Sequence, residues 1–471
     1  MKTKLLSLIR VISFILILTL IISGIYKVLS WKDTSGDYLS SVEQLYSTED
    51  NLIDVAFVGS SHVYNGVYPS ILWSEHGISA FDIAISGQDK ESAYYSLVEL
   101  LKTQSPKVVF VDLYALTYEG YNDEGNLYRN SLSLKPSINS YDLITSIAAS
   151  EDVSSHVSRF PIIHTRYREL TSFDFETNPL NIYSRGEHYS DVCLPLLDTM
   201  IFASSVEEVC DLSDTNRAWL DRLIELSIAE NFTLGFMVVP YTISYDAQAV
   251  MNGAAQYLSE NGIPCFDFNK NLDLLNIDIS TDFTDYSHLN YLGAQKLTSW
   301  LGTWLSQNHS LVDHRGDNTY YQWAADAHLY QNYHAQFQMN KTGNLAEMLS
   351  IASTTPDFIT VLSLSFNNED QLEGYEDAMS VTGISKEEFL NGGFWICKEG
   401  SFIKVVENDF NQLPYYEQLT DSNILRLHYD SSPYAATNIS IGHTNYNTFG
   451  THATVIVYDT YTQQVIYHGG Q

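Results

Sequence analysis

Three residues of the sequence could together make a nucleophile. Ser61 follows the short apolar run 55–58 and a turn of small residues, so its hydroxyl is expected at the C-terminal end of a buried strand. Far downstream, Asp285 and His288 lie three residues apart, just before an amphipathic helix. A serine becomes nucleophilic when an imidazole can take its proton and a carboxylate can orient that imidazole. The spacing therefore predicts a triad of Ser61, His288 and Asp285.

Each of these residues also has an ordinary structural explanation. Serines are common at the turns that end strands, and Asp285 could cap the helix that follows it. Asp282 is an alternative carboxylate for orienting the histidine. Ser60 and His62 are expected to be structural, with His62 pointing away from the site if Ser61 points into it.

The elements around the candidate triad alternate between strands and helices. Strands are expected at 54–58, 80–85, 107–112, 232–239 and 264–268, and helices at 91–102, 214–230, 246–260 and 291–305. This alternation predicts βαβ units and a parallel sheet within a three-layer α/β/α domain. Ligands of such sheets bind at the C-terminal ends of the strands. The segment 114–200 breaks the rhythm and is interpreted as an insertion over that edge, where substrate selection would take place.

The order of these motifs resembles the GDSL/SGNH hydrolases, whose domain is flavodoxin-like. The matching features are Gly59-Ser60-Ser61 after the first strand, Gly87 after the second, and Asp285-x-x-His288 before the last helix. The resemblance covers roughly residues 54–305. It is to the membrane-anchored extracytoplasmic branch, similar to the D-alanine-transfer protein of teichoic-acid synthesis and to the alginate O-acetylation proteins. In that branch the family's Gly-Asp-Ser reads Gly-Ser-Ser, and Ser61 matches the nucleophile.

The resemblance also implies an oxyanion hole. Its donors would be the backbone amides of Ser61 and Gly87, although Gly87 has an ordinary turn interpretation as well. The family's third donor is an Asn directly after the third strand, and no Asn stands there in this chain. The letters of 120–123, Gly-Tyr-Asn-Asp, fit that motif but lie several residues late, so a chance match is expected. The missing donor would weaken simple hydrolysis and is usual in the acyl-transfer branch.

The function implied is an extracytoplasmic serine-dependent O-acyltransferase or esterase acting on a cell-envelope polysaccharide or teichoic-type polymer. Ser61 would carry the acyl group as an ester before passing it to a sugar hydroxyl or to water. A membrane-bound O-acyltransferase partner is implied by the resemblance alone. The alternative is a non-catalytic envelope-binding or scaffold protein on a degenerate SGNH fold.

Composition narrows the partners and cofactors. The 471 residues carry a formal net charge of −33, which argues against nucleic acid or an anionic membrane surface as a partner. The four cysteines are too scattered for a zinc site; Cys193 and Cys210 could pair, but buried free thiols are expected. The calcium-like loop beginning at Asp267 lacks its glycine and final Glu. His314 and two further histidines near it are irregularly spaced, so no metal or other cofactor is expected.

The N-terminus predicts a membrane anchor. Basic residues up to Arg10 precede an uncharged stretch at 11–26, and the apolar segment counted from Leu5 is long enough to cross a bilayer about 30 Å thick. The basic end predicts that this terminus lies inside, with the bulk of the chain extracytoplasmic. A cleaved signal peptide is the alternative, but no good cleavage site follows.

Composition changes again near residue 308. The stretch 309–356 is interpreted as a connector, and 357–471 contains alternating β-branched strands that indicate a smaller β-rich α+β domain. The expected organisation is therefore an anchor at 1–30, an SGNH-like α/β domain at 31–308, the connector, and the C-terminal domain.

Overall fold

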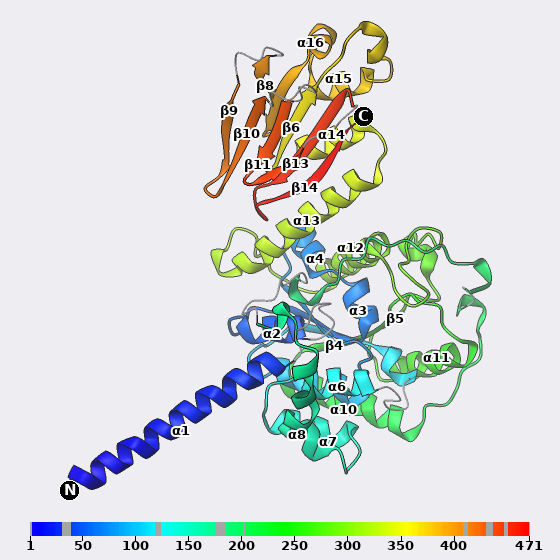
Figure 1. The fold of residues 1–471 in the computed structure, drawn as a ribbon. Helices are drawn as coiled ribbons and strands as arrows, with labels where there is room; N and C mark the ends of the chain where they lie inside the picture. Colours follow the sequence, from blue (N-terminus) through cyan, green and yellow to red (C-terminus); the bar gives the residue numbers. More distant parts are fainter. Residues whose placement is uncertain are drawn as a thin grey trace. The chain divides into compact units, whose positions relative to one another are not determined.

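The computed structural model describes residues 2–30, 39–117, 124–175, 184–200, 203–407, 413–429, 437–446 and 451–470. The chain divides into two units, Met1–Ala327 and His328–Gln471, each with its own sheets (Figure 1). The stretch 309–356, which the sequence assigns to a connector, is split between them. Helix α13 (Tyr321–Lys341) contains the division, and α14 (Leu345–Thr354) belongs to the second unit.

The first unit contains the parallel five-stranded sheet that the sequence predicts. Its strand order is β2-β1-β3-β4-β5, and every pairing is parallel. The strands are β1 (Val55–Gly59), β2 (Ala80–Ala84), β3 (Val108–Asp112), β4 (Thr233–Val238) and β5 (Cys265–Asp267). Every residue of the first three is buried, including Asp82 of β2 and Asp112 of β3, and the other residues of these strands are small or apolar. After β1 the chain adds β2 on one side of it and β3 on the other. Because the strand order reverses there, a ligand site is expected at the C-terminal ends of β1 and β3.

Helices cover both faces of this sheet (Figure 1). Side chains of β1 alternate between two cores, with Ala56 and Val58 in one and Val55 and Phe57 in the other. The first core is covered by α5 (Lys90–Leu100), α10 (Asp214–Glu230) and α11 (Tyr245–Glu260). The second is covered by α3 (Ser61–Gly66), α4 (Pro69–His76) and α12 (Tyr291–Asn308).

An N-terminal helix, α1 (Lys2–Leu29), precedes α2 (Leu39–Ser47) and the sheet. Its apolar stretch Leu8–Leu29 has a mean hydropathy of 2.6, and residues 8–25 of it are exposed within the structure. Among the described residues this is the one helix long and apolar enough to cross a membrane, a test that a signal sequence can also pass.

The insertion between β3 and α10 is built of short helices. They are η1 (Leu113–Thr117), α6 (Glu124–Leu132), α7 (Ile138–Ile147), α8 (Val153–Ser158), α9 (Phe160–Ile163), η2 (His164–Arg168), η3 (Ser172–Phe175), η4 (Ser184–Gly186), η5 (Asp198–Met200) and η6 (Ala203–Ser205). The insertion returns to the sheet at Gly186, whose φ is +94°. A Cβ there would lie 2.1 Å from the carbonyl oxygen of Asp82, so only glycine fits.

Two carboxyl groups are buried where the insertion meets β2. Glu187 accepts hydrogen bonds from the backbone N–H (2.8 Å) and the hydroxyl (2.6 Å) of Ser70. Burial raises the pKa of Glu187 to about 8 even though these bonds act in the opposite direction. Burial, with Glu187 nearby, also raises the pKa of Asp82 well above its ordinary value. Glu187, with a pKa of about 8, is therefore mostly protonated in the folded protein at neutral pH.

The second unit is built on two antiparallel sheets, ordered β14-β13-β6-β7-β8 and β12-β11-β10-β9. Their apolar faces meet in one core that includes Val361, Leu425 and Ile456. The other face of the first sheet packs against α14, α15 (Glu376–Thr382) and α16 (Lys386–Asn391). The strands are β6 (Phe358–Leu364), β7 (Gly393–Lys398), β8 (Ser401–Glu407), β9 (Tyr415–Thr420), β10 (Asn423–Tyr429), β11 (Thr437–Ile441), β12 (Thr444–Asn445), β13 (Ala453–Asp459) and β14 (Gln464–Gly470). A separate antiparallel β-rich region is thus confirmed.

A first prediction concerns Glu187. Between its ordinary pKa of 4.5 and the folded value of about 8, the folded protein binds more protons than the unfolded chain, so stability falls as pH rises through this window. Glu187→Gln cannot ionise and should flatten that slope by up to about 1.4 kcal/mol per pH unit. Urea unfolding at pH 5 and pH 7.5 measures it. Asp82→Asn should act in the same direction, and unchanged slopes in both variants would contradict the assignment.

A second prediction concerns the start of the second unit. Leu345, Met348 and Leu349 of α14 are buried against β6, so this helix is part of the unit's core. A fragment of residues 328–471 should unfold cooperatively in urea when followed by circular dichroism. The fragment 357–471 lacks α14 and should be markedly less stable or aggregate, because it exposes an apolar sheet face. Equal stability of the two fragments would place the boundary at 357 instead.

Candidate active site

The turn after β1 is shaped by a close approach of the backbone to its neighbours. A Cβ on Gly59 would lie 2.5 Å from Cγ2 of Val63 and 2.7 Å from Cβ of Asp112, so a larger residue would displace α3 or β3. Ser60 is the N-cap of α3 and accepts a hydrogen bond from the backbone N–H of His62. Ser61 is therefore the first residue of a helix that starts directly at the end of β1, and its side chain is only partly buried.

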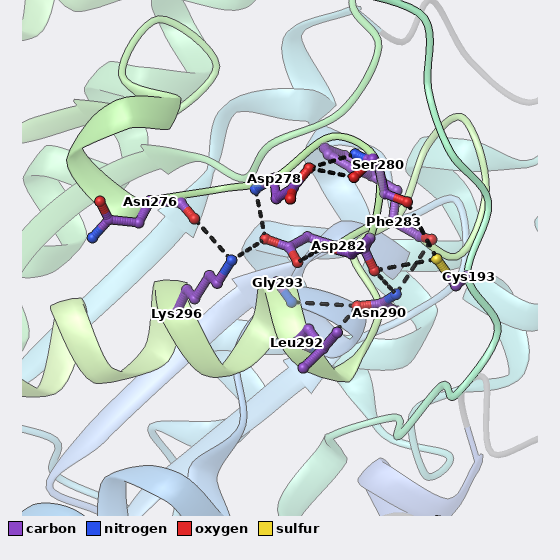
Figure 2. Close-up of polar contacts among 11 residues, drawn as sticks. Cys193, Asn276, Asp278, Ser280, Asp282, Phe283, Asn290, Leu292, Gly293 and Lys296 are labelled. Atoms are coloured by element: carbon purple, nitrogen blue, oxygen red, sulfur yellow. Dashed lines mark hydrogen bonds and ion pairs between the residues drawn. The ribbon is translucent and has the colours of Figure 1, made fainter. Parts of the chain in front are cut away.

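The loop before α12 is held by an ion pair with one buried member (Figure 2). The carboxylate of Asp282 is 1% exposed and lies 2.5 Å from Nζ of Lys296, which also donates to the carbonyl of Asn276 at 2.8 Å. Asp282 further accepts from the backbone N–H of Asp278 at 2.7 Å and from the Thr281 hydroxyl at 2.8 Å. The carboxylate of Asp282 therefore makes its contacts within the loop and with Lys296. The alternative prediction, that Asp282 orients His288, is wrong.

Asn290 joins the same loop to the start of α12 (Figure 2). Its side-chain oxygen accepts from the backbone N–H groups of Leu292 (3.0 Å) and Gly293 (3.3 Å), which caps the helix. Its side-chain nitrogen donates to the carbonyl of Thr281 at 2.6 Å. The residues between these anchors, 283–289, include Asp285 and His288 and are closed by a backbone bridge between Phe283 and Leu289.

The structure brings the three residues of the predicted triad together. Nε2 of His288 lies 2.7 Å from Oγ of Ser61, and Nδ1 lies 2.9 and 3.0 Å from the two carboxylate oxygens of Asp285. An ionised carboxylate can only accept, so Nδ1 carries the proton and Nε2 presents a lone pair to the serine hydroxyl. This arrangement lets the imidazole remove the proton of Ser61.

Asp285 is held ionised by the same contacts. Partial burial acts to raise its pKa, but hydrogen bonds from the His288 ring and from the backbone of Ser287 and His288 hold the pKa below its ordinary value. The backbone bonds, at 2.7 and 3.0 Å, also fix the turn between the two residues. Side-chain exposures of 50% for Asp285 and 22% for His288 show that this pair is open to solvent.

His62 does not point away from the site, which corrects the expectation from sequence. Its ring centroid lies 5.2 Å from that of His288, and it also packs against Tyr114 (4.1 Å) and Tyr241 (4.7 Å). Nδ1 of His62 lies 2.9 Å from Oγ of Ser60. Burial, with His288 nearby, holds the pKa of His62 well below its ordinary value. A neutral imidazole therefore supports His288 without adding a positive charge beside it.

Gly87 lies at a turn after β2 with φ +62°, a conformation that favours glycine. A Cβ there would lie 2.8 Å from the side-chain amide of Asn126, a residue of α6 that the sequence interpretation missed. Oδ1 of Asn126 accepts from Arg129 at 2.9 Å. No local pattern marks Asn126, because it reaches the turn only through packing of the insertion. The alternative motif at 120–123 lies outside the described residues.

Other chemical candidates have structural partners. Asp267 accepts from the side chain of Gln248 at 2.6 Å, and His314 lies 2.9 Å from a carboxylate oxygen of Asp54. All four cysteines carry free thiols. In the described part of the chain, no group of three or more His, Cys, Asp or Glu side chains could hold a metal ion.

Comparison with known proteins adds little. No protein-family model matches the chain, and no curated protein matches it. Among solved structures, a gut microbial diltiazem-metabolizing enzyme is 14% identical, with a TM-score of 0.20. The match covers 55% of this chain and 46% of that enzyme. At this score the likeness carries no information on fold or activity.

A third prediction concerns the loop that carries the acid and base. Asp282→Asn removes the charge that pairs with Lys296, and should cost about 1–3 kcal/mol of stability because a buried polar group loses partners. The displaced loop should also slow any reaction at Ser61. Urea unfolding and labelling by a fluorophosphonate measure both effects. Asp278→Asn, nearby but with its carboxylate bonded only within its own turn, should change both much less. Equal effects would contradict the role of the ion pair.

Proposed function

We propose that this chain is a membrane-anchored, extracytoplasmic serine-dependent O-acyltransferase or esterase of the SGNH type. Its substrate would be a cell-envelope polysaccharide or teichoic-type polymer. The observation that carries the proposal is the 2.7 Å contact between Nε2 of His288 and Oγ of Ser61, with Nδ1 of the same ring on Asp285. The resemblance of the surrounding motifs to SGNH proteins supports the substrate class.

In the first half of the proposed reaction, His288 takes the proton of Ser61 while Oγ attacks the carbonyl carbon of the acyl donor. The bond from that carbon to the leaving oxygen then breaks, and His288 returns the proton to the leaving group. Ser61 now carries the acyl group as an ester. Asp285 stabilises the imidazolium that forms between the two steps.

The second half repeats these steps with a new nucleophile. His288 deprotonates a sugar hydroxyl or a water molecule, which attacks the acyl carbon. The bond from that carbon to Oγ of Ser61 then breaks, and His288 returns the proton to Oγ. A sugar hydroxyl makes the protein a transferase, and water makes it an esterase. The acyl donor would come from a membrane-bound O-acyltransferase partner.

The oxyanion formed in each half needs donors placed before the reaction. The backbone amides of Ser61 and Gly87 are proposed for this role. Asn126 is proposed as a third donor because it lies against Gly87. Arg129 can only donate, so its 2.9 Å bond identifies Oδ1 as the acceptor and orients Nδ2 as the donor end of the amide. In this proposal the Asn that the family pattern has after its third strand would be supplied by the insertion instead.

The anchor part of the proposal rests on α1. Its apolar stretch Leu8–Leu29 is long enough to cross the membrane, and the basic residues before it favour an inside N-terminus. The remainder of the chain would then face outward, where envelope polymers are found.

A fourth prediction tests the chemistry by comparing adjacent serines. Ser61→Ala should abolish labelling by a fluorophosphonate probe, and His288→Ala should reduce it nearly as much, because an unassisted hydroxyl is a poor nucleophile. Asp285→Asn should cost less, through a misoriented imidazole. Ser60→Ala loses a helix cap worth about 1 kcal/mol but should keep most labelling.

The pair of serine variants separates chemistry from folding. Both substitutions lie in the same turn, so a general folding defect would affect them alike. Equal labelling of the parent and Ser61→Ala, with both proteins folded, would remove the catalytic assignment. The scaffold alternative would then be the better description.

A further inference from the structure

A group of exposed apolar side chains lies beside the end of α1. They belong to one stretch of the insertion, Val153–Phe175, here called the α8–η3 segment. Val157, Phe160, Tyr167 and Phe175 on this segment are exposed by 43%, 47%, 59% and 63%. Several large apolar side chains exposed on one short segment indicate a site for a partner or a membrane.

The segment is fixed to the last turn of α1 by Arg166. Its Nη1 donates to the carbonyl oxygens of Leu29 and Ser30, at 2.8 Å each. Carbonyls at a helix end lack partners within the helix, so this cation satisfies them. Arg166 is itself buried and pairs with Asp174 at 2.7 Å. The end of α1 and the α8–η3 segment are therefore packed against each other.

An aromatic contact lies at the same level. The ring of Tyr26 on α1 lies 6.0 Å from that of Phe160, and the Tyr26 hydroxyl donates to the carbonyl of Ser158. The apolar stretch of α1 has 22 residues, and at 1.5 Å per residue it is about 33 Å long, slightly more than the hydrocarbon thickness of about 30 Å. Tyr26, near its end, thus lies at the level of the lipid headgroups, where tyrosine is favoured. Phe160 must lie at that level as well.

We propose that the α8–η3 segment inserts its exposed apolar side chains into the headgroup layer of the membrane that α1 spans. The charge of the segment is compatible with this. It contains three arginines against Glu169 and Asp174, a net of +1, in a chain whose net charge is −33. Anionic headgroups would therefore not repel it as they would most of the protein surface. The inference rests on the anchor part of the proposed function and is independent of the acyl-transfer chemistry.

The test uses the full-length chain in nanodiscs of phosphatidylcholine and phosphatidylglycerol. Single cysteines replace Phe160 or Tyr167 in a Cys193→Ser background, because Cys193 is the exposed cysteine, and carry an environment-sensitive fluorophore. The control is Ile228→Cys on α10, a position 75% exposed. The Cys193→Ser chain without an added cysteine is labelled in the same way, and its signal is subtracted to correct for the remaining three thiols.

The emission of labels at 160 and 167 should be blue-shifted relative to the control. Lipids that carry a nitroxide on the headgroup should quench most of this emission, and aqueous iodide should quench little of it. The label at 228 should behave in the opposite way. Because Phe160 also contacts Tyr26, the label at 167 gives a measurement independent of that contact. Incorporated chains in which both labels behave like the control would overturn the inference alone. Failure of the chain to enter nanodiscs would overturn the anchor as well, while leaving the test at Ser61 unaffected.

Discussion

The hydrogen bond between Nε2 of His288 and Oγ of Ser61 is the contact on which the candidate site depends, and it joins residues 227 positions apart. Such a bond weakens steeply when its geometry is lost, so both partners must be fixed independently. The serine is fixed by the tight turn at Gly59, where no larger residue fits between β3 and α3. The histidine is fixed by its loop, which the pair of Asp282 with Lys296 ties to α12. The polar groups buried in this loop therefore affect Ser61 only by holding His288 in place.

The parts that sequence could predict are those set by local pattern. Buried parallel strands require apolar runs, so β1 to β3 were readable within a residue or two at each end. Asp285 and His288 are three residues apart and meet within one turn, so their pairing is also a local property. Their meeting with Ser61 followed from the edge at which parallel strands end. The antiparallel strands of the second unit were likewise marked by alternation and by the turns between them.

What sequence could not predict depends on packing between distant segments. Asn126 reaches Gly87 only because α6 folds back over the turn after β2, and no spacing encodes that. His62 was expected to turn away, but the cavity formed by Tyr114 and Tyr241 accommodates its ring beside His288. The second unit was expected to start at 357, whereas the apolar face of α14 is buried on β6 and belongs to it.

The insertion connects the candidate site to the end of α1. At one end Asn126 lies against Gly87, beside the candidate site. Within the insertion, Oγ of Ser131 on α6 lies 2.7 Å from Nδ1 of the buried His156 on α8. Beyond α8, Arg166 binds the carbonyl groups at the end of α1. This path consists of packed helices and buried hydrogen bonds, so contacts of the insertion join the end of α1 to the turn at Gly87. In the proposed arrangement, with α1 in the membrane, these contacts would set the height of Ser61 above the bilayer.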